Sequence, residues 1–265
     1  MPKIKVKDID IYYEIYGEGY PIIMIQGLSA NTDWWTKELL ESLEEDFKLI
    51  IFDNRGAGKT ENTNRDFSIK MLADDTLALM DALKINHFHI FGVSMGGMIA
   101  QELVINYPEK IEKLILGCTH CGGSKQILPS QEVLYILNRD HKKISPEKLI
   151  EGTIPLLFTE DFIKNDPKFI ESYRQKLLKS PMSPESFHRQ INAISRFNNY
   201  LKLEKITCPT LIIHGKKDVL VPYENADILN KRIKNSKLIL MNEAAHSFFQ
   251  PKPEIVIKEI KDFLK

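Results

Sequence analysis

The stretch Gly92-Val93-Ser94-Met95-Gly96-Gly97 lies between an apolar run, residues 87–91, and a helical pattern that begins at Met98. It is a G-x-S-x-G pattern in the strand–turn–helix setting that this pattern requires. A serine on so sharp a turn needs neighbours without side chains two positions before and after it, and glycine stands at both positions. The stretch therefore predicts that Ser94 projects above a sheet at the N-terminus of a helix.

Five further short apolar runs are similar to the run before the serine. They cover residues 21–25, 48–52, 114–116, 211–213 and 237–241. Short apolar runs without alternation are typical of parallel strands buried on both faces. Helical patterns separate the runs, at residues 69–83, 98–107, 223–233 and 253–264. Strands that alternate with helices predict an α/β fold with a mainly parallel sheet and helices on both faces.

Two segments depart from this alternation. Residues 3–16 alternate apolar and polar side chains, which predicts an antiparallel hairpin with its turn at Asp8-Ile9-Asp10. Residues 122–200 contain no convincing strand but several prolines and many aromatics, which predicts a helical insertion over one end of the sheet. We therefore expect a core formed by residues 1–121 and 201–265, and a helical cap formed by residues 122–200.

The composition limits the possible classes of protein. The chain has 265 residues, 43% of them hydrophobic, with 36 basic and 36 acidic residues and a formal net charge of zero. That balance argues against a general binder of phosphate backbones. The charged N-terminus predicts no secretory signal, and no apolar run approaches the roughly 18 residues of a membrane span. We expect a cytoplasmic monomer or homodimer that binds a small-molecule substrate and neither nucleic acid nor membrane.

A nucleophilic serine needs a base, and the base needs an orienting acid. Asp218 follows the strand at 211–213, and His246 follows the strand at 237–241, so both emerge at the carboxyl edge beside Ser94. His120 is the best rival base, but it would precede the acid along the chain. Glu243 is a poorer acid than Asp218 because it stands too near His246 in sequence to orient the ring easily.

The oxyanion of an acyl-transfer intermediate needs two N–H donors. The amide of Met95, at the start of the helix after Ser94, is the first expected donor. The second should come from the loop after the strand at 21–25, where Gly27 permits a close backbone approach and Leu28 supplies the amide. Trp34 and Trp35 follow in this loop; either can line a substrate pocket, and both can equally pack the start of a helix.

Taken together, these residues resemble the α/β-hydrolase superfamily over nearly the full chain. The resemblance rests on five stretches: 26–28, 52–58, 92–97, 214–218 and 245–246. It is strongest to the small esterases, enol-lactonases, carbon–carbon bond hydrolases and cofactor-free haloperoxidases. It implies Ser94 as nucleophile, Asp218 as acid and His246 as base, with Leu28 and Met95 as oxyanion donors. Many members have His-Gly where this chain has Gln26-Gly27, a difference that leaves the amide donor in place.

Two further motifs fail on inspection. Gly58-Lys59-Thr60 resembles a phosphate loop, but that motif needs glycine at position 53, where this chain has Asp53. In the resembling family, Arg55 in this loop is expected to stabilise neighbouring loops near the site. Cys118-Thr119-His120-Cys121 lacks the second ligand pair of a structural zinc site, so two small buried residues are expected there. We expect no metal and no organic cofactor.

The insertion adds two features that bear on substrate. Its aromatic side chains can form an apolar roof over a substrate, the core of the cap, or both. Four of its arginines, Arg139, Arg174, Arg189 and Arg196, can bind a substrate carboxylate, although such residues more often form a solvated face.

The sequence predicts a serine hydrolase that acts on a small carboxylic ester, thioester or lactone through an acyl-enzyme. Hydrolysis of a carbon–carbon bond in a vinylogous diketone is an alternative, because the same triad serves both reactions. A ligand-binding member of the fold without turnover is a third possibility. Dehalogenase and epoxide hydrolase chemistry with an aspartate nucleophile is disfavoured because position 94 is serine.

Overall fold

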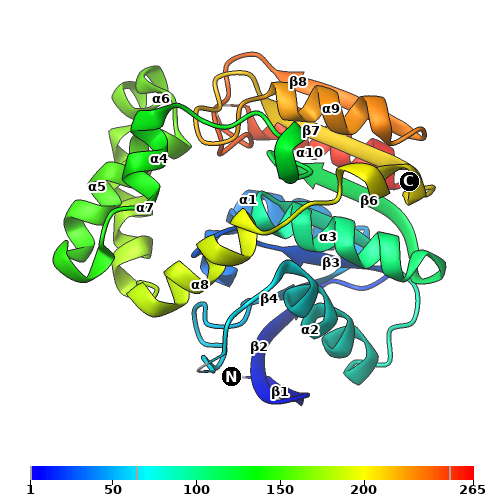
Figure 1. Ribbon diagram of the computed structural model, residues 1–265. Helices are drawn as coiled ribbons and strands as arrows, with labels where there is room; N and C mark the ends of the chain where they lie inside the picture. The colour runs from blue at the N-terminus through cyan, green and yellow to red at the C-terminus, as the bar shows by residue number, and fades with distance from the viewer. Residues whose placement is uncertain (1, 64, 251) are drawn as a thin grey trace.

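An eight-stranded sheet forms the centre of the molecule, in the strand order β1-β2-β4-β3-β5-β6-β7-β8. The computed structural model describes residues 2–63, 65–250 and 252–265. Strand β2 pairs antiparallel with both β1 and β4, and every other pairing in the sheet is parallel. The predicted α/β-hydrolase architecture, a mostly parallel sheet with an N-terminal antiparallel hairpin, is confirmed (Figure 1).

The strands are β1 Lys3–Val6, β2 Ile9–Tyr16, β3 Tyr20–Ile25, β4 Phe47–Phe52, β5 Phe88–Val93, β6 Ile111–Gly117, β7 Thr210–Gly215 and β8 Ser236–Met241. The α-helices are α1 Lys37–Glu44, α2 Ile69–Ala82, α3 Met95–Asn106, α4 Gln131–Leu137, α5 Pro146–Leu157, α6 Glu160–Asn165, α7 Pro167–Lys179, α8 Pro184–Ser195, α9 Glu224–Arg232 and α10 Pro253–Leu264. Short 3₁₀ turns occupy Thr32–Trp34, Pro108–Lys110, Gly123–Lys125, His141–Lys143 and Tyr200–Lys205.

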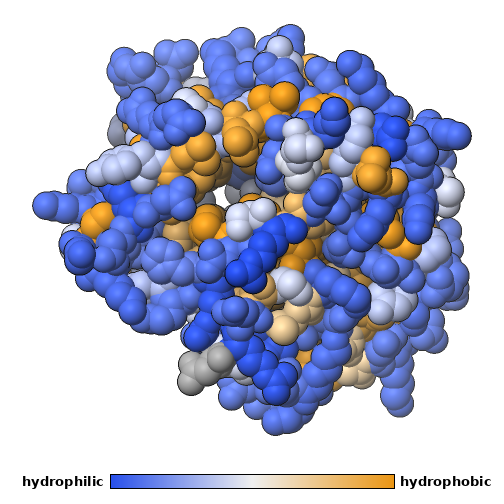
Figure 2. Space-filling view, viewed as in Figure 1, coloured by the Kyte–Doolittle hydropathy of each residue, from blue (hydrophilic) through white to orange (hydrophobic). Residues whose placement is uncertain are grey.

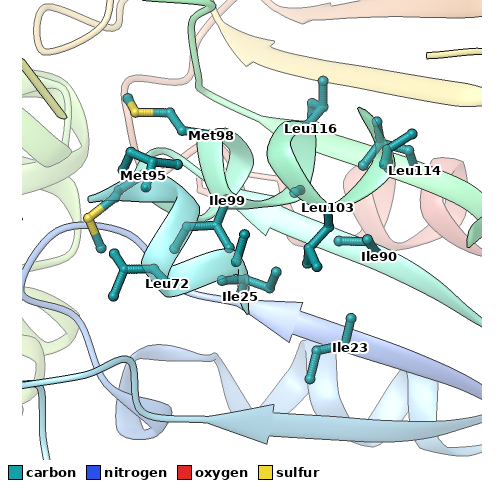
Figure 3. Packing of buried hydrophobic residues seen from close by; sticks show 14 of the residues in the cluster. Ile23, Ile25, Leu72, Ile90, Met95, Met98, Ile99, Leu103, Leu114 and Leu116 are labelled. Atoms are coloured by element: carbon teal, nitrogen blue, oxygen red, sulfur yellow. The ribbon is translucent and has the colours of Figure 1, made fainter. Parts of the chain in front are cut away.

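Alternate residues of the central strands enter two separate cores. In β3, Ile23 and Ile25 pack with helices α2, α3 and α9, whereas Ile22 and Met24 pack with α1 and α10 on the other face. Figure 3 shows the first of these cores, with side chains of α3 against β3, β5 and β6. Because both faces of a central strand are covered, its sequence is a continuous apolar run without alternation.

The turn that carries Ser94 is packed directly against the neighbouring strand β3. Ser94 has φ +56°, in the left-handed region that side chains rarely adopt. A Cβ added at Gly96 would lie 2.0 Å from the carbonyl oxygen of Ile25, and one at Gly92 would lie 2.3 Å from the carbonyl oxygen of Gly96. Both glycines are therefore required by close backbone contact.

Residues 122–200 form helices α4 to α8, which lie together to one side of the sheet (Figure 1). The two ends of this segment meet: Gly122 bridges Asn198, and the Asn199 amide donates to the Cys121 carbonyl at 2.8 Å. The helices also have a small core of their own, formed by Ile150, Ile154, Leu157, Phe158, Ile170 and Leu177. The described residues of this segment form helices and no named strand, as the sequence led us to expect.

Several predicted boundaries were wrong in detail. The hairpin turns at Lys7-Asp8, because Val6 pairs with Ile9, so the predicted turn residues Ile9 and Asp10 belong to β2. Helix α3 begins at Met95, directly after the strained turn, three residues before the apolar pattern that predicted it.

Helix α1 was not predicted, although a capping threonine precedes it. The Thr36 hydroxyl accepts the Leu39 amide at 3.3 Å. No helix in the described part of the chain has the length and apolar character needed to cross a membrane.

We predict that Gly96→Ala destabilises the fold by about 3 kcal/mol, because the added methyl group would have to displace the backbone of β3. Urea unfolding followed by circular dichroism measures this change. Gly152→Ala in α5 is the matched control: its Cβ would meet only the flexible end of Arg139. Alanine also favours a helix interior by up to about 1 kcal/mol over glycine. Equal stability of the two variants would contradict the close-packing argument.

Candidate active site

Strand β5 and helix α3 hold Ser94 at the carboxyl edge of the sheet. The Ser94 amide donates to the Gly117 carbonyl at 2.8 Å, and its carbonyl accepts from the Thr119 hydroxyl at 2.7 Å. These bonds fix the backbone of the strained residue on both sides of its Cα. The Ser94 side chain lines a cavity of about 490 Å³.

Two loops at the same edge bring an acid and a histidine together. Asp218 follows β7 and His246 follows β8, and the His246 Nδ1 lies 2.8 Å from the Asp218 Oδ2. His246 lines the same cavity as Ser94. In the described part of the chain, Ser94 and His246 do not hydrogen-bond to each other in this conformation, a common state of catalytic pairs without substrate.

Asp218 is surrounded by donors. Its Oδ1 accepts the amides of Leu220 and Val221 at 2.9 and 2.8 Å, and its Oδ2 lies 3.2 Å from the His214 Nε2 as well as near His246. Burial by itself raises the pKa of Asp218, but the positive charge and hydrogen bonds of His246 and His214 outweigh it. The pKa of Asp218 therefore lies well below its ordinary range, and the carboxylate stays charged.

Cys118, His214 and Asp218 lie within metal-binding distance of one another. However, the His214 Nε2 is 2.8 Å from the carbonyl oxygen of Val221, which can only accept, so this nitrogen carries a hydrogen. Burial raises the pKa of the Cys118 thiol well above its ordinary value, so the thiolate that a metal would need is disfavoured. Cys118 and His214 are therefore better described as neighbours that support Asp218 than as ligands of a metal site.

His120 does not line the cavity. Its Nδ1 accepts the Gly122 amide at 3.0 Å. Burial, together with the positive charges of His214 and His246, lowers the pKa of His120 to about 4. The geometry therefore favours His246 over His120 as the base, as the order along the chain predicts. Glu243 is exposed and pairs with Lys217, away from His246.

The loop after β3 carries Gly27 and Leu28 along the cavity, beside Ser94. A Cβ at Gly27 would lie 3.0 Å from the Ser94 Cβ, so only glycine allows this approach without displacement. In the described residues, the amides of Leu28 and Met95 donate to no protein acceptor. Helix geometry leaves the Met95 amide, at the first position of α3, without an intrahelical partner.

A polar network that the sequence analysis did not predict supports this loop. The Asp53 carboxylate accepts the amides of Thr32 and Lys59, each at 2.7 Å, and Asn54 Nδ2 donates to the Gln26 carbonyl at 3.0 Å. Arg55 pairs with Asp8 and Asp75, in agreement with its expected role in loop support.

Helix α8 reaches the same loop through Gln190. Its Oε1 accepts the Ser29 amide at 2.9 Å, and its Nε2 lies 3.4 Å from the Arg55 carbonyl. No sequence signal distinguishes this glutamine from an ordinary helix residue, because its partners are more than a hundred positions away.

The two tryptophans have different environments. Trp34 lines the cavity and packs edge-on against Tyr173 of α7, with ring centroids 5.6 Å apart. Trp35 is buried against Phe91 and Phe249, outside the cavity lining. The structure thus places one of the two candidate pocket residues beside the cavity and the other in the core.

The cavity lies between the sheet edge and helices α4 to α8. In the space-filling view, apolar side chains surround a hollow near the centre of the molecule (Figure 2). Apolar residues of α5, among them Leu149, Leu156 and Leu157, line it together with Ser94 and His246. The site can therefore hold a small, largely apolar molecule against the serine.

Comparison with known proteins identifies the family. The family model described as the α/β hydrolase fold matches residues 20–185, more than half of the chain, and a model described as TAP-like protein matches residues 193–265. The chain belongs to the α/β-hydrolase family. The resemblance inferred from the sequence motifs is confirmed, and so is the prediction of a hydrolase.

Individual relatives are distant in sequence but match over more than nine-tenths of the chain. Human serine hydrolase BPHL is 28% identical, covering 99% of this chain and 86% of that protein. A poly(3-hydroxyalkanoate) depolymerase of Ectopseudomonas oleovorans is 27% identical, covering 92% of this chain and 84% of that protein. The enol-lactonase structure from Burkholderia xenovorans LB400 superimposes with a TM-score of 0.88 at 22% identity, over 99% of each chain.

We predict that acidification destabilises the parent protein partly through His120. In the folded protein the pKa of His120 is about 4, whereas in the unfolded chain it is about 6.5. The unfolded state therefore binds the proton more readily as the pH falls. The folded state therefore loses about 2 kcal/mol through this group between pH 7 and pH 5. Urea unfolding at the two pH values should show a smaller loss in His120→Gln.

His87→Gln is the control for this measurement, because His87 is exposed just before β5. It should retain the pH dependence of the parent. An unchanged pH dependence in His120→Gln would contradict the assignment of this destabilisation to His120.

Proposed function

We propose that this α/β hydrolase is a serine hydrolase that cleaves a small carboxylic ester, thioester or lactone. Ser94 is the nucleophile, His246 the base and Asp218 the orienting acid. The observation that carries the proposal is the 2.8 Å contact of Asp218 with His246, which lines the same cavity as Ser94.

In the first half-reaction, the His246 Nε2 takes the proton from the Ser94 Oγ as this oxygen attacks the carbonyl carbon. The low pKa of Asp218 keeps its negative charge beside the imidazolium that forms. The tetrahedral intermediate collapses to the acyl-enzyme, and His246 returns the proton to the departing oxygen or sulfur. Water then attacks the acyl carbon while His246 accepts a proton from it. As the bond between the acyl carbon and the Ser94 Oγ breaks, His246 returns this proton to the Oγ and the acid is released.

The amides of Leu28 and Met95 stabilise the negative charge on the carbonyl oxygen. Two donors fixed by backbone packing need no reorganisation when this charge develops, which makes such donors effective. Gly27 supports the assignment because its missing side chain lets the loop approach Ser94. The substitution of Gln26 for the histidine of many relatives leaves both amides unchanged.

Residues 122–200 serve as a cap that covers the cavity. Helices α4, α5, α7 and α8 all contribute lining residues, and Trp34 and Phe169 add aromatic surface. Relatives named serine hydrolase and depolymerase support hydrolysis as the reaction class. Carbon–carbon bond cleavage uses the same triad, and a substrate panel of aryl esters, lactones and vinylogous diketones separates the reactions. A cytoplasmic location and a monomeric or dimeric state stay predictions from the sequence.

The proposal predicts that a fluorophosphonate forms one stoichiometric adduct on the parent protein, measured by intact mass. Ser94→Ala should abolish the adduct and lower kcat for an aryl ester by roughly 10⁶, and His246→Ala should have a similar effect. Asp218→Asn should lower kcat by roughly 10⁴, because the ring then lacks its charged partner.

Ser247→Ala is the matched control, because Ser247 lines the same cavity but lies outside the strained turn. It should retain the adduct and most of the activity. An adduct that persists in Ser94→Ala, or no adduct on well-folded parent protein, would refute an activated serine at position 94.

A further inference from the structure

Arg139 brings a positive charge to the wall of the cavity that contains Ser94. It follows α4, is half-buried, and lines the cavity together with Ile136 and Leu149. Its Nε donates to the Ile136 carbonyl at 3.3 Å, which anchors the stem of the guanidinium. Within the described part of the chain, its two terminal nitrogens have no carboxylate or carbonyl partner.

A glycine in α5 makes room for this guanidinium. Gly152 lies in the interior of α5, where glycine costs about 1 kcal/mol relative to alanine. A Cβ added there would lie 2.4 Å from the Arg139 Nη2. The helix therefore contains a recess that the end of the arginine fills, and any larger residue would displace the charged group.

The other arginines of the 122–200 segment have different surroundings. Arg174 pairs with Glu151 and Glu171, and Arg189 donates to Asn62 and to the Thr63 carbonyl. Arg196 is exposed and is not part of the cavity lining. Of the four arginines that the sequence left as candidates, the structure places only Arg139 on the cavity wall.

Two carboxylates, Glu38 and Asp166, also line the cavity, and in the described residues neither forms an ion pair with Arg139. Asp166 accepts the Phe169 amide as the N-cap of α7, and Lys37 pairs with Glu41. Lys176 donates to the Asp33 carbonyl, at the limit of hydrogen bonding. A guanidinium beside apolar side chains costs desolvation energy that an anionic ligand can recover. Its planar pair of N–H groups matches a carboxylate in bidentate geometry.

We propose that Arg139 binds a carboxylate carried by the substrate, so that the preferred substrates are carboxylate-bearing esters or lactones. This inference rests on the proposed function of Ser94. The scissile carbonyl lies at the serine, while the carboxylate pairs with the Arg139 guanidinium on the wall of the same cavity. Arg139 is then a specificity-determining residue and takes no part in proton transfer.

The test compares mono-p-nitrophenyl esters of adipic, pimelic and suberic acid with the corresponding methyl diesters. Each pair contrasts a free terminal carboxylate with its uncharged methyl ester. The three chain lengths sample the span between serine and arginine. The parent should prefer the best acid over its methyl ester by about tenfold or more in kcat/KM. Arg139→Gln should remove that preference mainly through KM, and change kcat/KM for the methyl esters by less than about twofold.

Two further variants separate the position of the Arg139 guanidinium from the general positive charge of the segment. Gly152→Ala should reproduce the loss of preference, because its methyl group takes the place of the Arg139 Nη2. Arg174→Gln removes a cap arginine that is already paired, and it should leave the preference unchanged. An equal ratio of acid to methyl ester in the parent and in Arg139→Gln would overturn the inference.

Binding to Ser94→Ala separates this inference from the proposed function. Calorimetry with monomethyl suberate and dimethyl suberate measures the carboxylate site without any chemistry. If no ester is hydrolysed but the acid binds in an Arg139-dependent way, the serine hydrolase proposal fails and the anion site stands. If the esters are hydrolysed without Arg139-dependent discrimination, the anion site fails. Tighter binding of a phosphonate analogue would overturn the assignment to a carboxylate.

Discussion

The close packing of the Ser94 turn against strand β3 is the constraint on which the rest of the site depends. Gly96 brings its Cα so near to the Ile25 carbonyl that no side chain fits between them. The same contact accompanies the positive φ of Ser94 and places the start of α3 directly against the sheet. It also brings the loop after β3, with Gly27 and Leu28, to the side of the serine. One steric constraint thus sets the positions of Ser94, the N-terminus of α3 and the neighbouring loop.

Around this fixed point, buried polar groups position the other parts. Asp218 accepts two backbone amides and two histidines, so its charge is maintained despite burial. Asp53 in turn accepts one amide from the loop that carries Leu28 and one from the loop after β4, and burial raises its pKa while these amides lower it. A buried carboxylate that loses its hydrogen-bond donors raises the free energy of the folded state. Movement of a loop that supplies these donors is therefore unfavourable, and each carboxylate holds its loop in place.

The helical segment 122–200 forms one side of the cavity that contains Ser94. Its helices supply an apolar wall, a contact from Gln190 to the loop beside the serine, and the charge of Arg139. The chemistry proposed for the sheet edge therefore needs no residue of α4 to α7, whereas the proposed substrate selectivity rests on residues of the 122–200 segment.

The sequence by itself determined the fold class, the order of the strands with most of the helices between them, and the residues Ser94, Asp218 and His246 as a candidate set. It could do so because short-range rules, apolar periodicity and the glycines of a strained turn, act over a few neighbouring residues. Only the tertiary structure decided that Trp34 and not Trp35 lines the cavity, and that Arg139 lies there while Arg174 is paired elsewhere. It alone identified Asp53 and Gln190 as supporting residues. Their partners are distant in sequence or belong to other elements, so packing decides these contacts and no local pattern records them.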